Sequence, residues 1–469
     1  MLERCAVSAI VLLLLQTTGC APQPLAYQAG LQTMGEIHLY LQPIPQEAQR
    51  LEVHITGISA IRSDGGSIPL EAFFSELKGR ELLGVQRRLA WAALPPGTYD
   101  GLSIAIGGAS LLGDEGPVDL LLPDAPLLVE EEFTVVRRRA STLFLSLDPA
   151  KLVTSGYRFT PVFSLAKPRR QLRGLLGFST NSASNLVSVF NKHTMSVVDT
   201  IATSSGPKGA VIDQRRQWVY VAIAGDDAIE AIEVSTGEIL RRLQLNFGDE
   251  PVEVALSPDG SLLVSANHGS NTASIIDAGS LLEVERVALP SAPTSVVAGG
   301  SSRRAYALQP LSNAVSVVDL SSRSIAATRI LDETPIRGAI SRDGDSLYVI
   351  TRYSSDLLVL DAVNLSVQGR IYVGTGAASI RTDPKTGLIY VGKRTGGISV
   401  LDPSSLLPID RFRIDGKVEF LAIDNDENSL FVVLPDSATI QKLDLISKKL
   451  KGVIEVGAGS YAVVVMGER

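Results

Sequence analysis

Short apolar runs return at a fixed interval over the C-terminal two-thirds of the chain. Between residues 218 and 444, each run is followed by a polar loop and a second apolar run that ends on an acid. Apolar runs this short, separated by polar turns, are typical of strands. Their interval of about 42 residues is typical of β-propeller blades. The sequence therefore predicts an all-β propeller, with the recurrent acids Glu233, Asp277, Asp319, Asp361, Asp402 and Asp444.

One repeat shows the expected internal order of a blade. A strand is predicted at residues 252–256, followed by a Ser-Pro-Asp-Gly turn and a second strand at 262–265. A third strand at 273–277 ends on the acid, and a fourth lies near 284–288. Four antiparallel strands make one propeller blade. The acid at the end of the third strand needs no catalytic role, because its carboxylate can accept backbone amides two residues further on.

The two ends of the repeat region complement each other. The first copy begins at residue 175 without its first strand, and a matching apolar strand is found at residues 461–466. Sharing one blade between both ends would remove the open edges of the ring. We therefore expect seven blades over residues 175–469, six of which open at Pro207, Pro251, Pro293, Pro335, Ala377 and Val418.

These marks resemble the YVTN family of β-propellers. The resemblance rests on the Tyr-Val strands, the Ser-Pro-Asp-Gly turn at residues 257–260 and the Ser-Asn-x-Val-Ser-Val-Val-Asp run at residues 312–319. It spans the C-terminal two-thirds of the chain and implies a propeller built from repeats of this kind.

Residues 34–166 show a different pattern. Apolar and polar residues alternate in several short runs separated by Gly- and Pro-rich turns, which predicts a β-sandwich, with one short helix near residues 70–77. The stretch Leu-Pro-Pro-Gly-Thr-Tyr-Asp-Gly-Leu-Ser-Ile at residues 94–104 resembles a transthyretin-like sandwich family of unknown function found in bacterial lipoproteins. A basic segment at residues 167–174 is the expected linker to the propeller.

The N-terminus reads as an export signal. About 10 apolar residues follow a weakly basic start, which suits the core of a secretory signal but is too short to span a bilayer. The stretch then ends in Gly19-Cys20 and resembles the lipobox of bacterial lipoproteins, in which the cysteine is acylated and becomes the new N-terminus. An ordinary cleaved signal is the alternative. Residues 1–20 are thus expected to be a signal and residues 21–33 a tether.

Localisation and partners follow from that resemblance and from the charge of the chain. No aspartate follows Cys20, and in enterobacterial lipoproteins such a residue retains the protein at the inner membrane. We expect an outer-membrane lipoprotein, periplasmic or surface-exposed, held to the membrane by its lipid. The formal net charge of -7 argues against nucleic acid as a partner.

Candidate chemistry is sparse. The four histidines have no metal-ligand spacing, and no haem, phosphate-loop or nucleophile-elbow motif occurs. We expect no metal and no cofactor. The first strands of the blades, such as residues 252–256 and 418–423, are expected to be mainly apolar. A propeller hydrolase or lactonase usually needs acids or histidines that converge on the channel, so it remains the alternative function.

The loops around one rim of the ring are the favoured binding site. We expect a binding or scaffold protein that presents this rim to a protein or polysaccharide partner at the cell envelope, where opposed charges could orient a polar ligand. Solvated loops without a ligand are the bland alternative. The candidate rim residues are Asp226, Asp227, His268, Arg352, Tyr353, Lys393 and Arg394.

The first prediction concerns the anchor. We expect Cys20→Ala to abolish incorporation of labelled fatty acid and to release the protein from the membrane fraction, because the acylated thiol is lost. A Cys5→Ala variant is the matched control, since Cys5 lies within the signal that is removed. A Cys20→Ala protein that still carries an acyl group would contradict the lipobox interpretation.

Overall fold

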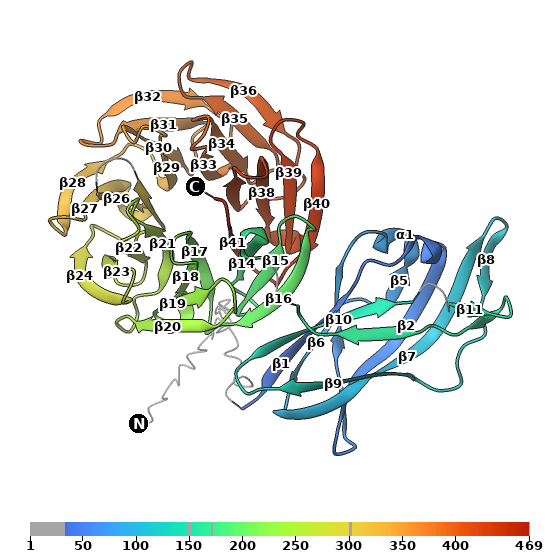
Figure 1. Cartoon of the computed structure of the whole chain (residues 1–469). Coiled ribbons are helices and arrows are strands. Elements are labelled where there is room, and N and C mark those ends of the chain that lie inside the picture. The colour runs from blue at the N-terminus through green and yellow to red at the C-terminus, as the bar shows by residue number, and fades with distance from the viewer. Residues whose placement is uncertain (1–32, 149–151, 170–171, 300–302, 469) are drawn as a thin grey trace, which may run out of the picture.

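A computed structural model describes residues 33–148, 152–169, 172–299 and 303–468. Cys20, the expected lipid anchor, and residues 21–32 of the expected tether lie outside the described residues. Strands dominate both parts of the chain, which confirms the predicted all-β class (Figure 1). None of the helices in the described residues is long and apolar enough to cross a membrane.

The N-terminal part contains two large sheets and one two-stranded hairpin among the described residues. The first has five strands in the order β13-β10-β1-β6-β4, and β1 and β10 pair in parallel. The second has the order β3-β2-β7-β8, with β5 paired to β2 and β9 paired to β7. The first sheet comprises β1 (Gly35–Leu41), β4 (Glu71–Ala72), β6 (Arg87–Leu94), β10 (Ala140–Leu147) and β13 (Phe163–Ala166). The second comprises β2 (Leu51–Arg62), β3 (Ser67–Pro69), β5 (Glu76–Lys78), β7 (Gly97–Gly113), β8 (Gly116–Asp119) and β9 (Leu127–Val135).

Residues 70–77 are not helical, so that expectation is wrong. Short strands β4 and β5 there pair with the edges of β6 and β2, and this pairing overrides the helical pattern. A single helical turn, α1 (Gly79–Leu82), follows β5. The remaining elements of this part are η2 (Gln46–Ala48) and the hairpin of β11 (Val153–Thr154) and β12 (Arg158–Phe159).

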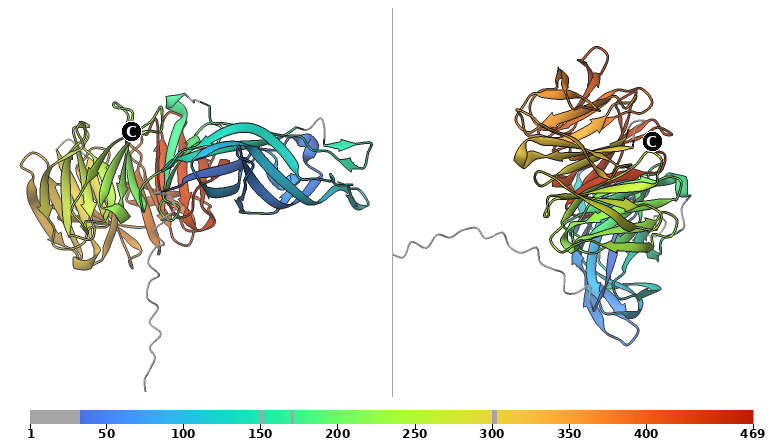
Figure 2. Two further views of the ribbon diagram at one scale, coloured as in Figure 1. Left: turned by 90° about the horizontal axis from the view of Figure 1, so that it is seen from below. Right: turned by 90° about the vertical axis from the view of Figure 1, so that its left-hand side faces the viewer.

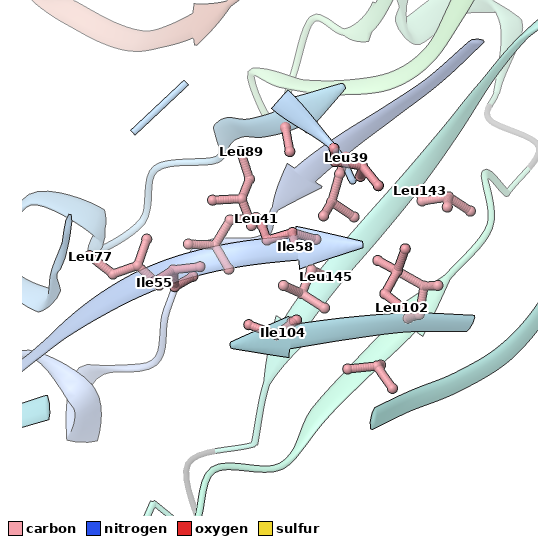
Figure 3. Packing of buried hydrophobic residues seen from close by; sticks show 14 of the residues in the cluster. Leu39, Leu41, Ile55, Ile58, Leu77, Leu89, Leu102, Ile104, Leu143 and Leu145 are labelled. Carbon is pink, nitrogen blue, oxygen red and sulfur yellow. The ribbon is translucent and has the colours of Figure 1, made fainter. Parts of the chain in front are cut away.

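The two sheets share one apolar core. Alternate residues of β2, such as Val53 and Ile55, are buried while their neighbours are not, as the period-two pattern requires. Figure 3 shows Ile55 and Ile58 of β2 near Leu41 of β1 and Leu145 of β10, in the core that both sheets share. Burying both inner faces in one cluster explains why the alternation persists through this part of the chain.

The C-terminal part consists of seven four-stranded sheets set around a ring (Figure 1). The first sheet has the order β16-β15-β14-β41 and contains β14 (Leu176–Asn181), β15 (Leu186–Asn191), β16 (Ser196–Ala202) and β41 (Ser460–Val465). The other six follow chain order. They are β17 (Pro207–Asp213), β18 (Trp218–Ile223), β19 (Ala228–Glu233) and β20 (Ile239–Gln244); β21 (Pro251–Leu256), β22 (Leu262–Asn267), β23 (Thr272–Asp277) and β24 (Leu282–Ala288); β25 (Ser295–Gly299), β26 (Arg304–Gln309), β27 (Ala314–Asp319) and β28 (Ser324–Ile330); β29 (Pro335–Ile340), β30 (Ser346–Thr351), β31 (Asp356–Asp361) and β32 (Val367–Tyr372); β33 (Ala377–Thr382), β34 (Ile389–Lys393), β35 (Ile398–Asp402) and β36 (Leu407–Phe412); and β37 (Phe420–Asp424), β38 (Ser429–Leu434), β39 (Thr439–Asp444) and β40 (Leu450–Glu455). Four short 3-10 turns, η4 (Arg173–Leu175), η5 (Ala224–Asp226), η6 (Pro310–Ser312) and η7 (Pro435–Ser437), lie in connections.

The middle strands are apolar because each sheet packs between two others. Strands β22 and β38 are buried at every position, whereas the outer strand β20 is almost wholly exposed. Neighbouring sheets are also joined by the repeated tyrosine. The hydroxyl of Tyr220 donates to the carbonyl of Ala278 on the next sheet (2.7 Å), and Tyr306 donates to Ala362 (2.9 Å).

The five recurrent aspartates accept backbone amides in their turns, as predicted, and Glu233 accepts the hydroxyl of Thr236 (2.8 Å). The Asp319 carboxylate accepts the backbone amides of Ser321 (2.9 Å) and Ser322 (2.8 Å). These bonds hold the pKa of the Asp319 carboxyl below its ordinary value. The stabilisation is therefore present at neutral pH and is lost as the pH falls through the lowered pKa. Asp277, Asp361, Asp402 and Asp444 accept amides in the same way.

The ends of the ring meet in one sheet. Strand β41 pairs antiparallel with β14 along residues 177–181. A buried lysine fixes the junction: the Lys192 ammonium lies 2.6 Å from an Asp424 carboxylate oxygen and donates to the carbonyl of Met466 at 2.6 Å. The ion pair thus ties the first sheet, the last sheet and the C-terminal strand together.

The N-terminal part lies beside the ring, against the outer strands β16 and β40 (Figures 1 and 2). The buried side chain of Gln86 accepts the amide of Val197 (2.8 Å) and donates to the carbonyl of the same residue (3.0 Å). Nearby, Glu455 accepts the amide of Arg88 (2.9 Å) and pairs with Arg87. The two parts therefore meet through directed polar contacts.

The second prediction concerns ring closure. Removing residues 461–469 should lower the melting temperature and cause aggregation, because β14 becomes an open edge and the buried Val463, Val464 and Val465 are lost. Each buried valine contributes about 1.5–3 kcal/mol, so the loss is comparable with the usual net stability of a domain. Leu450→Ala, at an exposed position of β40, is the control and should unfold like wild type in differential scanning calorimetry. Unchanged unfolding of the truncated protein would refute the role of β41.

The third prediction tests the contact between the two parts. Gln86→Ala leaves the amide and carbonyl of Val197 without their partners and should lower the free energy of unfolding by about 1–3 kcal/mol. Gln368→Ala, at an exposed glutamine, should change it by less than about 0.5 kcal/mol. Urea denaturation of both variants measures the difference, and equal stabilities would show that the Gln86 contacts are not energetically important.

Candidate functional site

The ring has two distinct faces. Because successive strands of each sheet run antiparallel, the loops after second strands and the connections between sheets lie at one end. We call this end the linker face. The turns after first and third strands lie at the other end, which we call the turn face. All seven candidate rim residues lie at the linker face, in or beside the loops that follow β18, β22, β30 and β34.

Three of the candidates, Asp226, Asp227 and His268, form contacts within the protein. The Asp227 carboxylate accepts the amides of Gly248 (2.9 Å) and Glu250 (2.8 Å) in the connection to the next sheet. Asp226 pairs with Arg242 at 3.3 Å. An imidazole nitrogen of His268 lies 3.2 Å from the carbonyl of Pro293. Asp227 and His268 therefore contact the connection to the next sheet, and Asp226 pairs within its own sheet. All three side chains are occupied by these contacts and are poorly placed to bind a ligand.

The remaining four candidates form a basic patch, defined as Arg352, Tyr353, Lys393 and Arg394. They come from the adjacent sheets β29–β32 and β33–β36. Tyr353 is 84% exposed. Within the part of the chain that the structure describes, none of the four side chains has an ion-pair or hydrogen-bond partner. The structure therefore leaves this patch available to solvent.

Two exposed apolar side chains lie on the same face, in the loops of other sheets. Leu311 of η6 is 79% exposed, and Phe247, in the connection between β20 and β21, is 101% exposed relative to the reference state. Sequence reasoning missed both, although each stands in a polar loop where an isolated large apolar residue is conspicuous.

The backbone under these loops is fixed by hydrogen bonds. The amide of Arg352 donates to the carbonyl of Thr334 (2.9 Å), and the Thr334 hydroxyl bonds to Asn313 of the previous sheet (2.9 Å). The amide of Arg394 donates to the carbonyl of Gly376 (2.7 Å) in the same manner. Each loop is thus tied to the connection beside it, which gives the linker face a rigid surface.

The inner strands are mainly apolar, but single charged residues in or beside three of them meet in the centre of the ring. The Arg337 guanidinium lies 3.3 Å from Glu253 and 3.5 Å from Glu419, and only 12% of its side chain is exposed. Its charge also sits 5.5 Å from the ring centres of both Phe420 and Tyr461. A cation held between two aromatic rings and two carboxylates is strongly stabilised.

The central cluster is electrically balanced. Lys417 pairs with Glu419 at 2.5 Å, so two cations face two carboxylates. Burial raises the pKa of Tyr461 despite the opposing effect of Arg337, so the phenol is neutral at neutral pH. The second carboxylate oxygen of Glu253 accepts the amide of Val296 (3.0 Å). These contacts join different sheets at the centre of the ring and therefore stabilise it.

A large cavity of about 1150 Å³ occupies the axis of the ring. Its walls include Glu253, Arg337 and Phe420 of the inner strands and turn-face residues such as Arg342 and Glu468. The cavity therefore runs from the central cluster to the turn face, away from the basic patch. Among the described residues, no group of three His, Cys, Asp or Glu side chains is placed to hold a metal ion.

Comparisons with known proteins agree with this architecture. The uncharacterized protein YncE of Salmonella typhi, and that of Salmonella typhimurium, is 19% identical over 262 residues, which are 52% of this chain and 74% of that protein. A functionally unknown protein from Desulfotomaculum acetoxidans has a solved structure that is similar with a TM-score of 0.56 at 13% identity. The match covers 63% of this chain and 99% of that chain and shows a common fold alone.

The family itself is shown by a match over most of the repeat region. The model of the family described as YNCE-like beta-propeller matches residues 173–469, more than half of the chain. The predicted propeller of repeats is thereby confirmed, and the chain belongs to the YNCE-like β-propeller family.

Proposed function

We propose that the protein is an envelope lipoprotein that binds a protein or polysaccharide partner through the linker face of a closed seven-bladed propeller. In this proposal the seven sheets are the seven blades, the N-terminal part is a transthyretin-like sandwich, and the acylated Cys20 anchors the chain, preferably at the outer membrane. The export signal and lipobox resemblance support the anchor. The shared sheet of β14 and β41 supports the closed ring.

The observation that carries the proposed binding function is the exposed basic patch, on the same face as two exposed apolar side chains. Tyr353, Leu311 and Phe247 are large side chains that remain exposed to water. Arg352, next to Tyr353 in the chain, and Arg394, in the corresponding loop of the adjacent sheet, are exposed as well. Tyr and Arg are the residues most often found as energetic anchors of interfaces. Loops fixed by backbone hydrogen bonds lose little conformational freedom on binding, which favours affinity.

The hydrolase alternative receives less support from the described residues. A hydrolase would need free acids converging on the channel, but Glu253 and Glu419 are engaged by Arg337. We therefore favour a rigid binding surface over a hydrolytic centre.

The fourth prediction tests the patch. A soluble form that lacks residues 1–20 is used to capture partners from intact envelopes. The double variant Arg352→Ala/Arg394→Ala should retain at least about tenfold less of the partner that wild type captures, since each interface anchor commonly contributes more than 1 kcal/mol. Its thermal stability should stay close to that of wild type, because both side chains are exposed.

Asp319→Ala is the control for this experiment. It removes a turn acid on the opposite face, so it should lower stability while capture by the linker face is unchanged. Equal capture by the double variant and wild type would move the binding site away from the patch, with the N-terminal part as the next candidate.

A further inference from the structure

The axial cavity opens at the turn face. One arginine on the wall of the cavity, Arg381, pairs with a carboxylate that lies outside the strands of the ring. Arg381 of β33 is 38% exposed in its side chain, so its guanidinium reaches the cavity. Its charge lies 5.7 Å from the ring centre of Phe420. Among the described residues its ion-pair partner is Glu468 alone, which lies beyond the end of β41. The contact therefore joins a wall residue to a segment outside the sheets.

The position of Glu468 is set by one side chain. Gln214 accepts the amide of Gly467 (3.2 Å) and donates to the carbonyls of Val465 (3.2 Å) and Glu468 (3.0 Å). Gly467 has a φ of +95°, a conformation that glycine adopts without strain. The chain thereby turns from β41 into the cavity, and the Glu468 carboxylate, which is only 9% exposed, meets Arg381 there. This carboxylate belongs to the segment after β41 and not to a strand of the cavity wall.

The charges at the inner end of the cavity are already matched. Arg337 is neutralised by Glu253 and Glu419 at the inner end. The lining between that end and the mouth contains small apolar side chains, among them Ala255, Val297, Ala339 and Val464. The volume of about 1150 Å³ is sufficient for a small molecule. An apolar wall beside one displaceable carboxylate partner suits a ligand with an acid group and an apolar body.

We propose that the axial cavity binds a small carboxylic acid, whose carboxylate takes the place of Glu468 on Arg381 while its apolar body lies along the cavity wall. Arginine binds carboxylates in a planar, bidentate geometry, and Phe420 restricts the orientation of its guanidinium. Glu468 is then an internal competitor that lowers the affinity for the ligand. This site lies on the opposite face from the proposed partner surface and does not rest on that function.

The fifth prediction uses benzoate as the probe and benzamide as its uncharged match. The Glu468→Gln protein should bind benzoate about tenfold more tightly than wild type in isothermal titration calorimetry, because the competing carboxylate is gone. Benzamide, which carries no charge, should bind wild type and Glu468→Gln with equal affinity. Arg381→Gln in the Glu468→Gln background should abolish benzoate binding, whereas Arg342→Gln, at an exposed arginine of the cavity mouth, should retain it.

Folding and independence are checked alongside. Melting temperatures identify any variant that is destabilised. Arg381→Lys in the Glu468→Gln background is a second substitution that keeps the positive charge, and we expect its affinity for benzoate to lie between those of Glu468→Gln and the Arg381→Gln double variant. The Arg352→Ala/Arg394→Ala protein should bind benzoate as wild type does, so failure of the partner surface would not affect this result. Equal benzoate affinity in wild type and Glu468→Gln, retention of binding without Arg381, or no benzoate binding by Glu468→Gln would each overturn the proposal.

Discussion

The hydrogen bonds between β14 and β41 join segments from opposite ends of the repeat region. The amide of Ala462, for example, donates to the hydroxyl of Thr180, across 282 positions in the sequence. Such a contact forms only after a very long loop has closed, which is entropically costly and slow. Every other sheet of the ring is built from strands that follow one another directly. The integrity of the ring therefore depends on the one sheet that does not share this local order.

The central cluster depends on the same closure. Tyr461 stands on β41 and forms one side of the aromatic sandwich around Arg337. Glu253, Arg337 and Glu419 come from three further sheets, so the cluster spans the axis of the ring. Breaking a buried ion pair by removing one partner typically costs about 3–5 kcal/mol, since the other charge remains uncompensated. Closure thus fixes both the outer wall of the ring and the charges at its centre.

Most of the fold could be predicted from the sequence because it is repeated. The acids at the ends of third strands were explained by turn geometry alone, and Asp319 accepts the amides that this explanation requires. The central cluster could not be predicted in the same way. Glu253 and Arg337 are separated by 84 positions, and each stands singly in an apolar strand. A single charged residue inside an apolar strand could have indicated a buried ion pair. The sequence does not show which residue is its partner, because the arrangement of the sheets around the ring decides which strands face each other.

The candidate rim residues share one face of the ring, yet they differ in role. His268, like Arg352 and Arg394, directly follows the second strand of its sheet, but its imidazole contacts a backbone carbonyl of the next connection, and Asp227 accepts backbone amides there. Loop position in the repeat determines the face on which a side chain lies. Whether the side chain forms a hydrogen bond within the protein depends on the length and path of the neighbouring connection between sheets. That connection differs from one repeat to the next.

The lateral position of the N-terminal part has a consequence for access. It contacts β16 and β40 at the outer wall and lies beside the ring in both views (Figures 1 and 2). Neither end of the ring axis is covered by it. A macromolecule on the linker face and a small molecule in the axial cavity could therefore be bound simultaneously without steric conflict. The Arg337 cluster lies between the two sites along the axis.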